Sequence, residues 1–72
     1  MIIVYQNREG FVNIDTINEV TVENNRIIAR YGNNTSILGE YNSNIKAEQL
    51  VRDMVNAMRQ GKTVFELPQT RN

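Results

Sequence analysis

Two residue types that often cross-link small proteins, bind metals or take part in catalysis are absent from this chain. It has 72 residues and contains neither cysteine nor histidine. The absence of cysteine excludes disulfide bonds and thiolate metal sites, and the absence of histidine excludes imidazole bases, imidazole zinc ligands and histidine pH switches. A core in a domain of this size supplies only about 3–5 kcal/mol of net stability. Association with another subunit is therefore the expected means of adding stability.

An excess of one charge and a long hydrophobic run are also missing. Eight basic residues balance eight acidic ones, which argues against a general nucleic-acid or anionic-membrane binder. No apolar run approaches the roughly 20 residues of a membrane span. Residues 1–4 lack the basic segment and cleavage pattern of a signal peptide. We therefore predict a cytoplasmic protein with no membrane partner.

The first half of the chain has the pattern of short strands separated by turns. Runs rich in β-branched and aromatic residues predict strands at 2–6, 11–14, 17–23, 26–31, 35–41 and 63–67. Asn24-Asn25 suits a two-residue type I′ hairpin, because asparagine tolerates positive φ. Gly10 is expected to supply positive φ in the first turn, and Gly39, inside a strand pattern, indicates a bulge or a close backbone approach.

Residues 43–60 predict one amphipathic helix. Ser43 or Asn44 is expected to cap its start, and Gly61 is a natural residue just past its end. An apolar stripe follows the i, i+3, i+4 spacing of a helix face and consists of Ala47, Leu50, Val51, Met54 and Met58, widened by Val55 and Ala57. The stripe must pack on the sheet, because no other element is available to cover it.

These elements predict an α+β fold. We expect a mostly antiparallel sheet of four to six short strands in a meander, one C-terminal amphipathic helix packed on it, and a short terminal strand ended by Pro68. Residues 1–68 are expected to form a single domain and residues 69–72 a frayed tail. The alternative is a strongly curled sheet resembling a partial barrel, with the helix plugging one end.

The predicted strands carry apolar residues on both faces, although one helix covers only one face. We assign to the helix side Val4, Val20, Val22, Ile27, Ala29 and Ile37. We assign to the opposite side Ile3, Tyr5, Ile28 and Leu38. The second set predicts an interface, either through this face or through an edge strand, and a homodimer. Two alternatives are an inverted register and a curled sheet that buries both sets.

Catalytic chemistry is not indicated. Ser36 and Ser43 have no histidine to activate them. Glu19 and Glu23 are four residues apart but lie in no apolar setting that would make them an acid–base pair. The residues predict no enzyme, no cofactor and no metal site. They predict instead a small non-enzymatic protein-interaction module, with a second copy as its partner and another protein as a further candidate.

One alternative partner is nucleic acid. Arg52, Arg59 and Lys62 lie on or just after the exposed helix face and are candidate backbone contacts. Glu48 and Asp53 dilute this positive patch, so we expect a solvated helix face instead.

The segment 37–43 (Ile-Leu-Gly-Glu-Tyr-Asn-Ser), the helix stripe that follows it and the ending Phe65-Glu66-Leu67-Pro68 form a recurrent pattern. With Asn13-Ile14-Asp15 near the start, this pattern resembles that of short uncharacterised proteins from low-GC Gram-positive bacteria and their phages. The resemblance implies the strand, capped turn, helix and strand order described above and an origin in a phage or mobile element. It implies no activity and no site residues.

Overall fold

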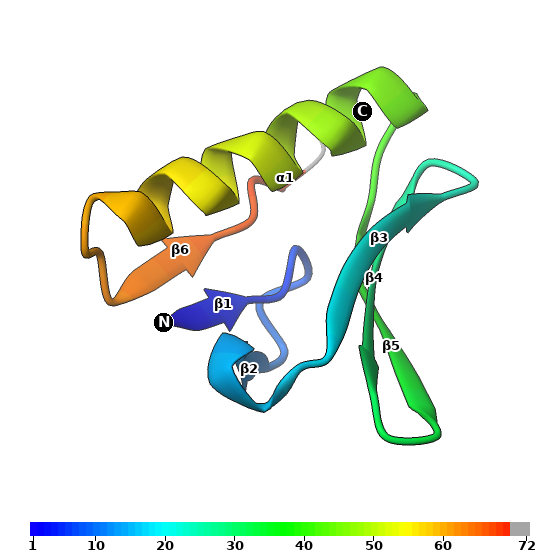
Figure 1. The fold of residues 1–72 in the computed structure, drawn as a ribbon. Coiled ribbons are helices and arrows are strands. Elements are labelled where there is room, and N and C mark those ends of the chain that lie inside the picture. Colours follow the sequence, from blue (N-terminus) through cyan, green and yellow to red (C-terminus); the bar gives the residue numbers. More distant parts are fainter. Residues whose placement is uncertain (70–72) are drawn as a thin grey trace.

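The computed structural model describes residues 1–69, which form six strands, one 3₁₀ turn and one helix (Figure 1). The elements in chain order are β1 (Ile2–Val4), β2 (Phe11–Asn13), η1 (Ile14–Thr16), β3 (Glu19–Glu23), β4 (Arg26–Tyr31), β5 (Asn34–Glu40), α1 (Asn44–Arg59) and β6 (Val64–Glu66). The α+β class is confirmed. The expected tail at 69–72 lies, apart from Gln69, outside the described residues.

The strands form two three-stranded sheets, so the expectation of one sheet with four to six strands is wrong. We call β2-β1-β6 the N-terminal sheet and β3-β4-β5 the meander sheet. β1 is the central strand of its sheet, antiparallel to β2 and parallel to β6. Both sides of β1 are occupied, so β1 forms no ladder with a strand of the meander. Helix α1 is not the last element, because β6 follows it and returns to β1.

The meander follows the predicted turn chemistry. Asn24 and Asn25 have φ of 52° and 66°, so the predicted hairpin between β3 and β4 is confirmed. The β4–β5 register shifts between Ile27 and Ile28, opposite Gly39. A Cβ on Gly39 would lie 3.0 Å from Cε2 of Tyr41. Gly39 therefore marks both a bulge and a close approach, as its place in the strand predicts.

The first turn uses a different residue from the one expected. Arg8 has φ of 64°, whereas Gly10 is not among the residues with positive φ. The Arg8 guanidinium donates to the carbonyl of Leu67 over 2.6 Å and to that of Tyr5 over 3.1 Å. These bonds favour the left-handed conformation of Arg8, and no local sequence pattern indicates them.

Helix α1 begins and ends where predicted. Ser43 is its N-cap and accepts a hydrogen bond from the N–H of Lys46 over 3.1 Å. Gly61 follows the last turn with φ of 75°. The helix packs on β3 and β4 and lies across the top of both sheets in Figure 1. Its buried residues are Ala47, Leu50, Met54 and Ala57.

The core lies between α1 and the two sheets. Its fully buried large side chains are Ile3, Ile27, Leu38, Met54 and Leu67. One β strand from each sheet therefore contributes an isoleucine, and the segment after β6 closes the core with Leu67. The burial of these apolar side chains is the main favourable term in the stability of the fold.

Candidate interaction surfaces

The four residues assigned to an outward face divide into two groups. Ile3 and Leu38 are fully buried in the core, so their expected outward orientation is wrong. Tyr5 is half-buried and packs against the core, whereas Ile28 is half-buried and is not among the side chains packed on the core. The reversal follows from pairing: Ile3 pairs with Val12 and Phe65, both of which contact the core.

Residues assigned to the helix side divide in the same way. Ile27 and Ala29 are fully buried, and Val20 and Val22 pack against the core, as expected. Ile37 is 54% exposed, so its expected orientation is wrong. Ile37 is paired directly with Ile28, which faces outward, and residues directly opposite one another on two strands share a face of the sheet.

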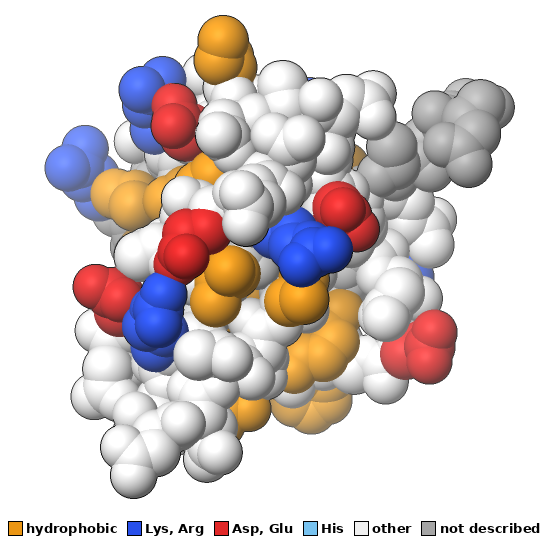
Figure 2. Space-filling view, turned by 90° about the vertical axis from the view of Figure 1, so that its right-hand side faces the viewer, with side chains coloured by type: hydrophobic (Ala, Val, Ile, Leu, Met, Phe, Trp, Pro, Cys, Tyr) orange, Lys and Arg blue, Asp and Glu red, His pale blue; other side chains and the backbone are white. Residues whose placement is uncertain are grey.

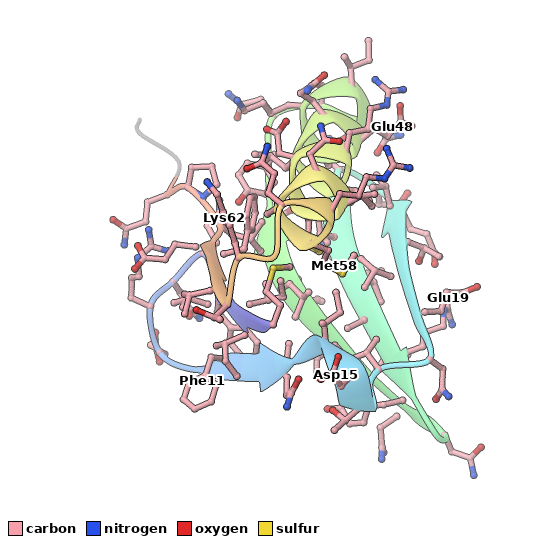
Figure 3. The ribbon with its side chains drawn as sticks, turned by 60° about the vertical axis from the view of Figure 1, so that its left-hand side comes forward. Phe11, Asp15, Glu19, Glu48, Met58 and Lys62 are labelled. Atoms are coloured by element: carbon pink, nitrogen blue, oxygen red, sulfur yellow. The ribbon has the colours of Figure 1, made fainter. Side chains whose placement is uncertain are left out.

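The N-terminal sheet has an uncovered apolar face. Ile3 points inward, so its neighbours Ile2 and Val4 point the other way, together with the residues paired to them. We call this surface the outer face of the N-terminal sheet; it comprises Ile2, Val4, Phe11, Asn13, Val64 and Glu66. Phe11 is 66% exposed and Val64 49% exposed. Figure 3 shows Phe11 directed away from the body of the molecule.

The outer face of the meander sheet is more polar. Ile28 pairs with Ile37 across β4 and β5, and Thr21 pairs with Ile28 on the other side. Arg30 pairs with Glu19 over 3.1 Å and also with Glu23. On the other flank, Arg26 pairs with Glu40 over 3.5 Å. Figure 2 shows hydrophobic side chains lying between such groups of opposite charge.

A third surface is an apolar groove of about 250 Å³ between α1 and β3. We call it the α1–β3 groove. Its lining is mostly apolar, although Asn18 and Glu19 around the start of β3 also contribute to it. The apolar side chains are those of Ile14, Ile17, Val20, Val51, Met54, Val55 and Met58. Met58 is 40% exposed and lies beneath the helix in Figure 3. Val51, Val55 and Met58 belong to the apolar stripe of α1, which extends beyond the width that β3 and β4 cover.

No acid–base or nucleophilic constellation is formed by the predicted residues. Glu19 and Glu23 are engaged with Arg30, and Ser43 caps the helix. The Ser36 hydroxyl is 2.7 Å from that of Tyr31. Within residues 1–69 no group of three or more acidic residues is arranged to hold a metal ion. In the same part of the chain, no helix combines the length and hydropathy needed to span a membrane.

Among the described residues, Tyr41 has a pKa that departs clearly from its ordinary value. Burial raises the pKa of the Tyr41 hydroxyl to about 12, and the nearby Arg8 guanidinium offsets part of this rise. The hydroxyl donates a hydrogen bond to the carbonyl of Pro68 over 2.9 Å. Tyr41 thus remains protonated at neutral pH and holds the C-terminal segment against the end of β5.

The predicted basic residues are exposed, and two of them, Arg52 and Arg59, line one shallow hollow on α1 together with Val51, Val55 and Asn56. Arg52, Arg59 and Lys62 are all solvent-exposed, and none of the ion pairs among residues 1–69 involves them. Glu48 is equally exposed on the same helix. The structure therefore adds no observation that favours nucleic-acid binding over a solvated helix face.

Comparison of the chain with protein-family models, with curated proteins and with solved structures found no match in any of the three.

Two of these surfaces could not be located by the sequence reasoning, although each left a signal. Phe11-Val12 and Val64-Phe65 place apolar side chains on both faces of short strands, so the inward side depends on the partner strand. Val55 widens the helix stripe, and that width is the signal for the groove. A three-stranded sheet that crosses under a helix leaves the margin of a wide stripe uncovered.

Proposed function

We propose that this chain is a small non-enzymatic protein-interaction module that self-associates as a homodimer. The observation that carries the proposal is the uncovered apolar outer face of the N-terminal sheet. Contiguous exposed apolar surface on a small domain usually marks a site of protein contact. Phe11 is the natural anchor of this face, since exposed aromatic side chains contribute strongly when they become buried at an interface.

Self-contact is compatible with the charges on this face. In a two-fold dimer the same surface meets itself, so an unpaired charge would face a like charge. Glu66 is the single ionised side chain of the face, and its carboxylate lies 3.6 Å from the Arg8 guanidinium of the same chain. The guanidinium offsets part of the repulsion that two copies would otherwise experience there.

A dimer also adds buried apolar surface, of which a chain of this size has little. A domain of about 60 to 70 residues buries only roughly 60% of the surface that its unfolded chain exposes. Removing Phe11 and Val64 from water adds apolar burial at about 25 cal/mol per Å². Dimer formation and folding are then linked, so the stability of the protein should rise with its concentration.

The test is the mass of the protein in solution. By sedimentation equilibrium near micromolar concentration we expect the wild type to be a dimer. Replacement of Phe11 by Glu (F11E) should weaken association by about 30-fold or more, because it buries a charge in place of an aromatic anchor. Circular dichroism should show an unchanged helix, since Phe11 contributes little to the protomer core.

The matched control is Ile37→Glu, which places the same charge on an exposed strand residue of the meander sheet. It should leave the dimer intact. A wild-type protein that is monomeric throughout the concentration range would contradict self-association. Dissociation by Ile37→Glu and not by F11E would instead place the interface on the face that carries Ile28.

A further inference from the structure

The meander sheet ends in a strand edge that is available for pairing. Within residues 1–69, β3 has β4 on one side and no strand on the other. The residues that flank the two-residue turn, Glu23 and Arg26, are paired through their backbone N–H and carbonyl groups. Every second residue of β3, counted back from Glu23, therefore directs its backbone groups toward β4. The backbone groups of Val20 and Val22 therefore point toward the free edge. Unpaired groups of this kind are a template for another strand.

The other strand edges of the described chain have fewer free backbone groups. Gln6 covers the end of the far edge of β5, where its N–H donates to the carbonyl of Leu38 over 3.0 Å, and leaves only residues 34–37 of that edge. The Gln6 side chain also bonds to the backbone N–H and carbonyl of Glu40. The outer strands of the N-terminal sheet, β2 and β6, have three residues each, whereas β3 has five. β3 is therefore the longest open edge of the described chain.

The α1–β3 groove lies beside this edge, on the side to which Val20 points. A strand added to β3 would place every second side chain in the groove, against Val51, Val55 and Met58. The groove volume of about 250 Å³ is below the roughly 300–1,000 Å³ of typical small-molecule pockets. It suits one or two aliphatic side chains of a peptide better than a complete small ligand.

The other side chains of an added strand would face the acidic row of β3. This row consists of Glu19, Thr21 and Glu23, and within residues 1–69 Arg30 is the one cation that pairs with its two carboxylates. The row therefore keeps an excess negative charge next to the open edge. Basic side chains at the alternate positions of the added strand would complement it.

The same row disfavours a second copy at this edge. The antiparallel register that pairs all five residues of β3 with β3 of another copy places Glu19 directly opposite the other copy's Glu23. Like charges directly opposite one another destabilise a strand pair. The edge is therefore suited to a different chain and is protected against self-pairing.

We propose that the α1–β3 groove binds an extended peptide segment in which aliphatic residues alternate with lysine or arginine, added to the meander sheet as a fourth strand at β3. This mode is β-augmentation, in which backbone hydrogen bonds provide affinity and the alternate side chains provide specificity. The site is separate from the outer face of the N-terminal sheet and does not depend on self-association through it.

The first test uses three synthetic peptides of equal length. The probe alternates valine with lysine, a second peptide alternates valine with glutamate, and a third alternates serine with lysine. Binding to the full-length protein is measured by fluorescence anisotropy. The valine–lysine peptide should bind at least about tenfold more tightly than either of the others. Equal binding of the serine–lysine peptide, or no binding of the probe, would overturn the proposal.

The second test locates the site. Met58→Gln removes an apolar wall of the groove and should weaken binding of the probe by about tenfold, whereas Ile45→Gln changes a helix residue that is 80% exposed and outside the groove and should have no effect. Hydrogen exchange at the amides of Val20 and Val22 should slow when the probe binds. Unchanged exchange there would exclude strand addition, even if the probe binds elsewhere.

The experiments distinguish failure of the homodimer proposal from failure of the peptide-binding proposal. The F11E variant should bind the probe with unchanged affinity whether or not the wild type is a dimer. If Met58→Gln dissociates a wild-type dimer, the groove holds a second copy and the proposal of a basic–aliphatic partner is overturned.

Discussion

At the scale of single residues, the junction between the two sheets depends on a few close contacts around Gly39. A Cβ at this position would lie 3.0 Å from Cε2 of Tyr41 and 3.2 Å from Cβ of Gln6. Gln6 in turn holds the backbone of Glu40 through two hydrogen bonds, of 2.7 and 2.8 Å. The absence of a side chain at Gly39 is what allows β5, the loop after β1 and the Tyr41 ring to meet.

Replacement of Gly39 by Ala should therefore destabilise the fold by about 1–3 kcal/mol, because the added methyl group overpacks a site bounded by two elements. Urea denaturation followed by circular dichroism measures the change. Gly10→Ala is the control: its Cβ would lie 3.4 Å from Tyr5, an ordinary contact, and φ at Gly10 is not positive. The control should differ from wild type by no more than about 0.5 kcal/mol, and equal losses in the two variants would contradict this account.

At the scale of elements, a hydrogen bond connects the turn of the β3–β4 hairpin to the first turn of helix α1. The N–H of Asn25 donates to Oδ1 of Asn44 in the first turn of the helix over 2.7 Å. The N–H of Tyr41 donates to the carbonyl of Asn25 over 2.8 Å. A turn defined by two asparagines thus also positions the start of α1, which explains how a short hairpin and a helix keep a defined angle.

Two substitutions of Asn25 should have opposite effects, because φ at this residue is 66°. Asn25→Ala should destabilise the protein by about 1 kcal/mol, since a Cβ without a hydrogen-bonding side chain is strained in the left-handed region. Asn25→Gly should be neutral or stabilise by a few tenths of a kcal/mol, up to about 1. Both variants keep the N–H that reaches Asn44. Thermal unfolding of the two variants in parallel measures the difference, and an Ala variant as stable as the Gly variant would show that the turn carries no strain.

At the scale of the whole molecule, the C-terminal segment connects the two sheets. β6 pairs with β1 in the N-terminal sheet, Leu67 is fully buried in the core, and the carbonyl of Pro68 accepts the hydrogen bond of Tyr41. Because the last strand pairs with the first, the fold closes only when nearly the whole chain is present. Long-range pairing of this kind is formed late and at high entropic cost.

Alkaline pH should therefore loosen the whole molecule through Tyr41. The pKa of its hydroxyl is about 12 in the folded chain, against an ordinary value of 10.0. Below pH 10 both states hold the proton and the stability is unaffected. Between pH 10 and about 12 the unfolded chain loses the proton first, so the stability falls as the pH rises.

The measurement is the urea midpoint as a function of pH, compared between the wild type and Tyr41→Phe. The variant lacks the ionising group and should show a shallower decline across the window, although it is less stable at neutral pH because the Pro68 carbonyl loses its donor. Ultraviolet absorbance of tyrosinate reports the titration of Tyr41 directly. Parallel pH profiles for the two proteins would mean that Tyr41 does not link folding to pH.

The elements that sequence reasoning located correctly are those whose causes are local. Helix α1 follows from the spacing of Ala47, Leu50 and Met54 and from the cap at Ser43, all within one segment. The turn at Asn24-Asn25 follows from the tolerance of asparagine for positive φ. The bulge at Gly39 follows from a glycine inside a strand pattern. None of these predictions needs knowledge of a distant partner.

The candidate surfaces depended on information that no local pattern contains. Whether Ile3 or its neighbours face the core is decided by pairing with Val12 and Phe65, which lie 9 and 62 residues away along the chain. A shift of one residue in a strand exchanges its two faces. The sequence pattern places Ile3 and Leu38 outside and Val4 and Ile37 inside for this reason. The structure reverses all four and keeps Ile28 outward.

The sequence by itself determined the α+β class, the helix and its ends, the Asn24-Asn25 turn and the absence of thiol and imidazole chemistry, because each of these depends on residue type and short-range spacing. Only the tertiary structure decided that the strands divide into two sheets, which face of each sheet is covered, and that an open edge lies beside an apolar groove. The physical reason is that side chains alternate along a strand with a period of two, so the side that is buried depends on which distant strand pairs with it and in which register.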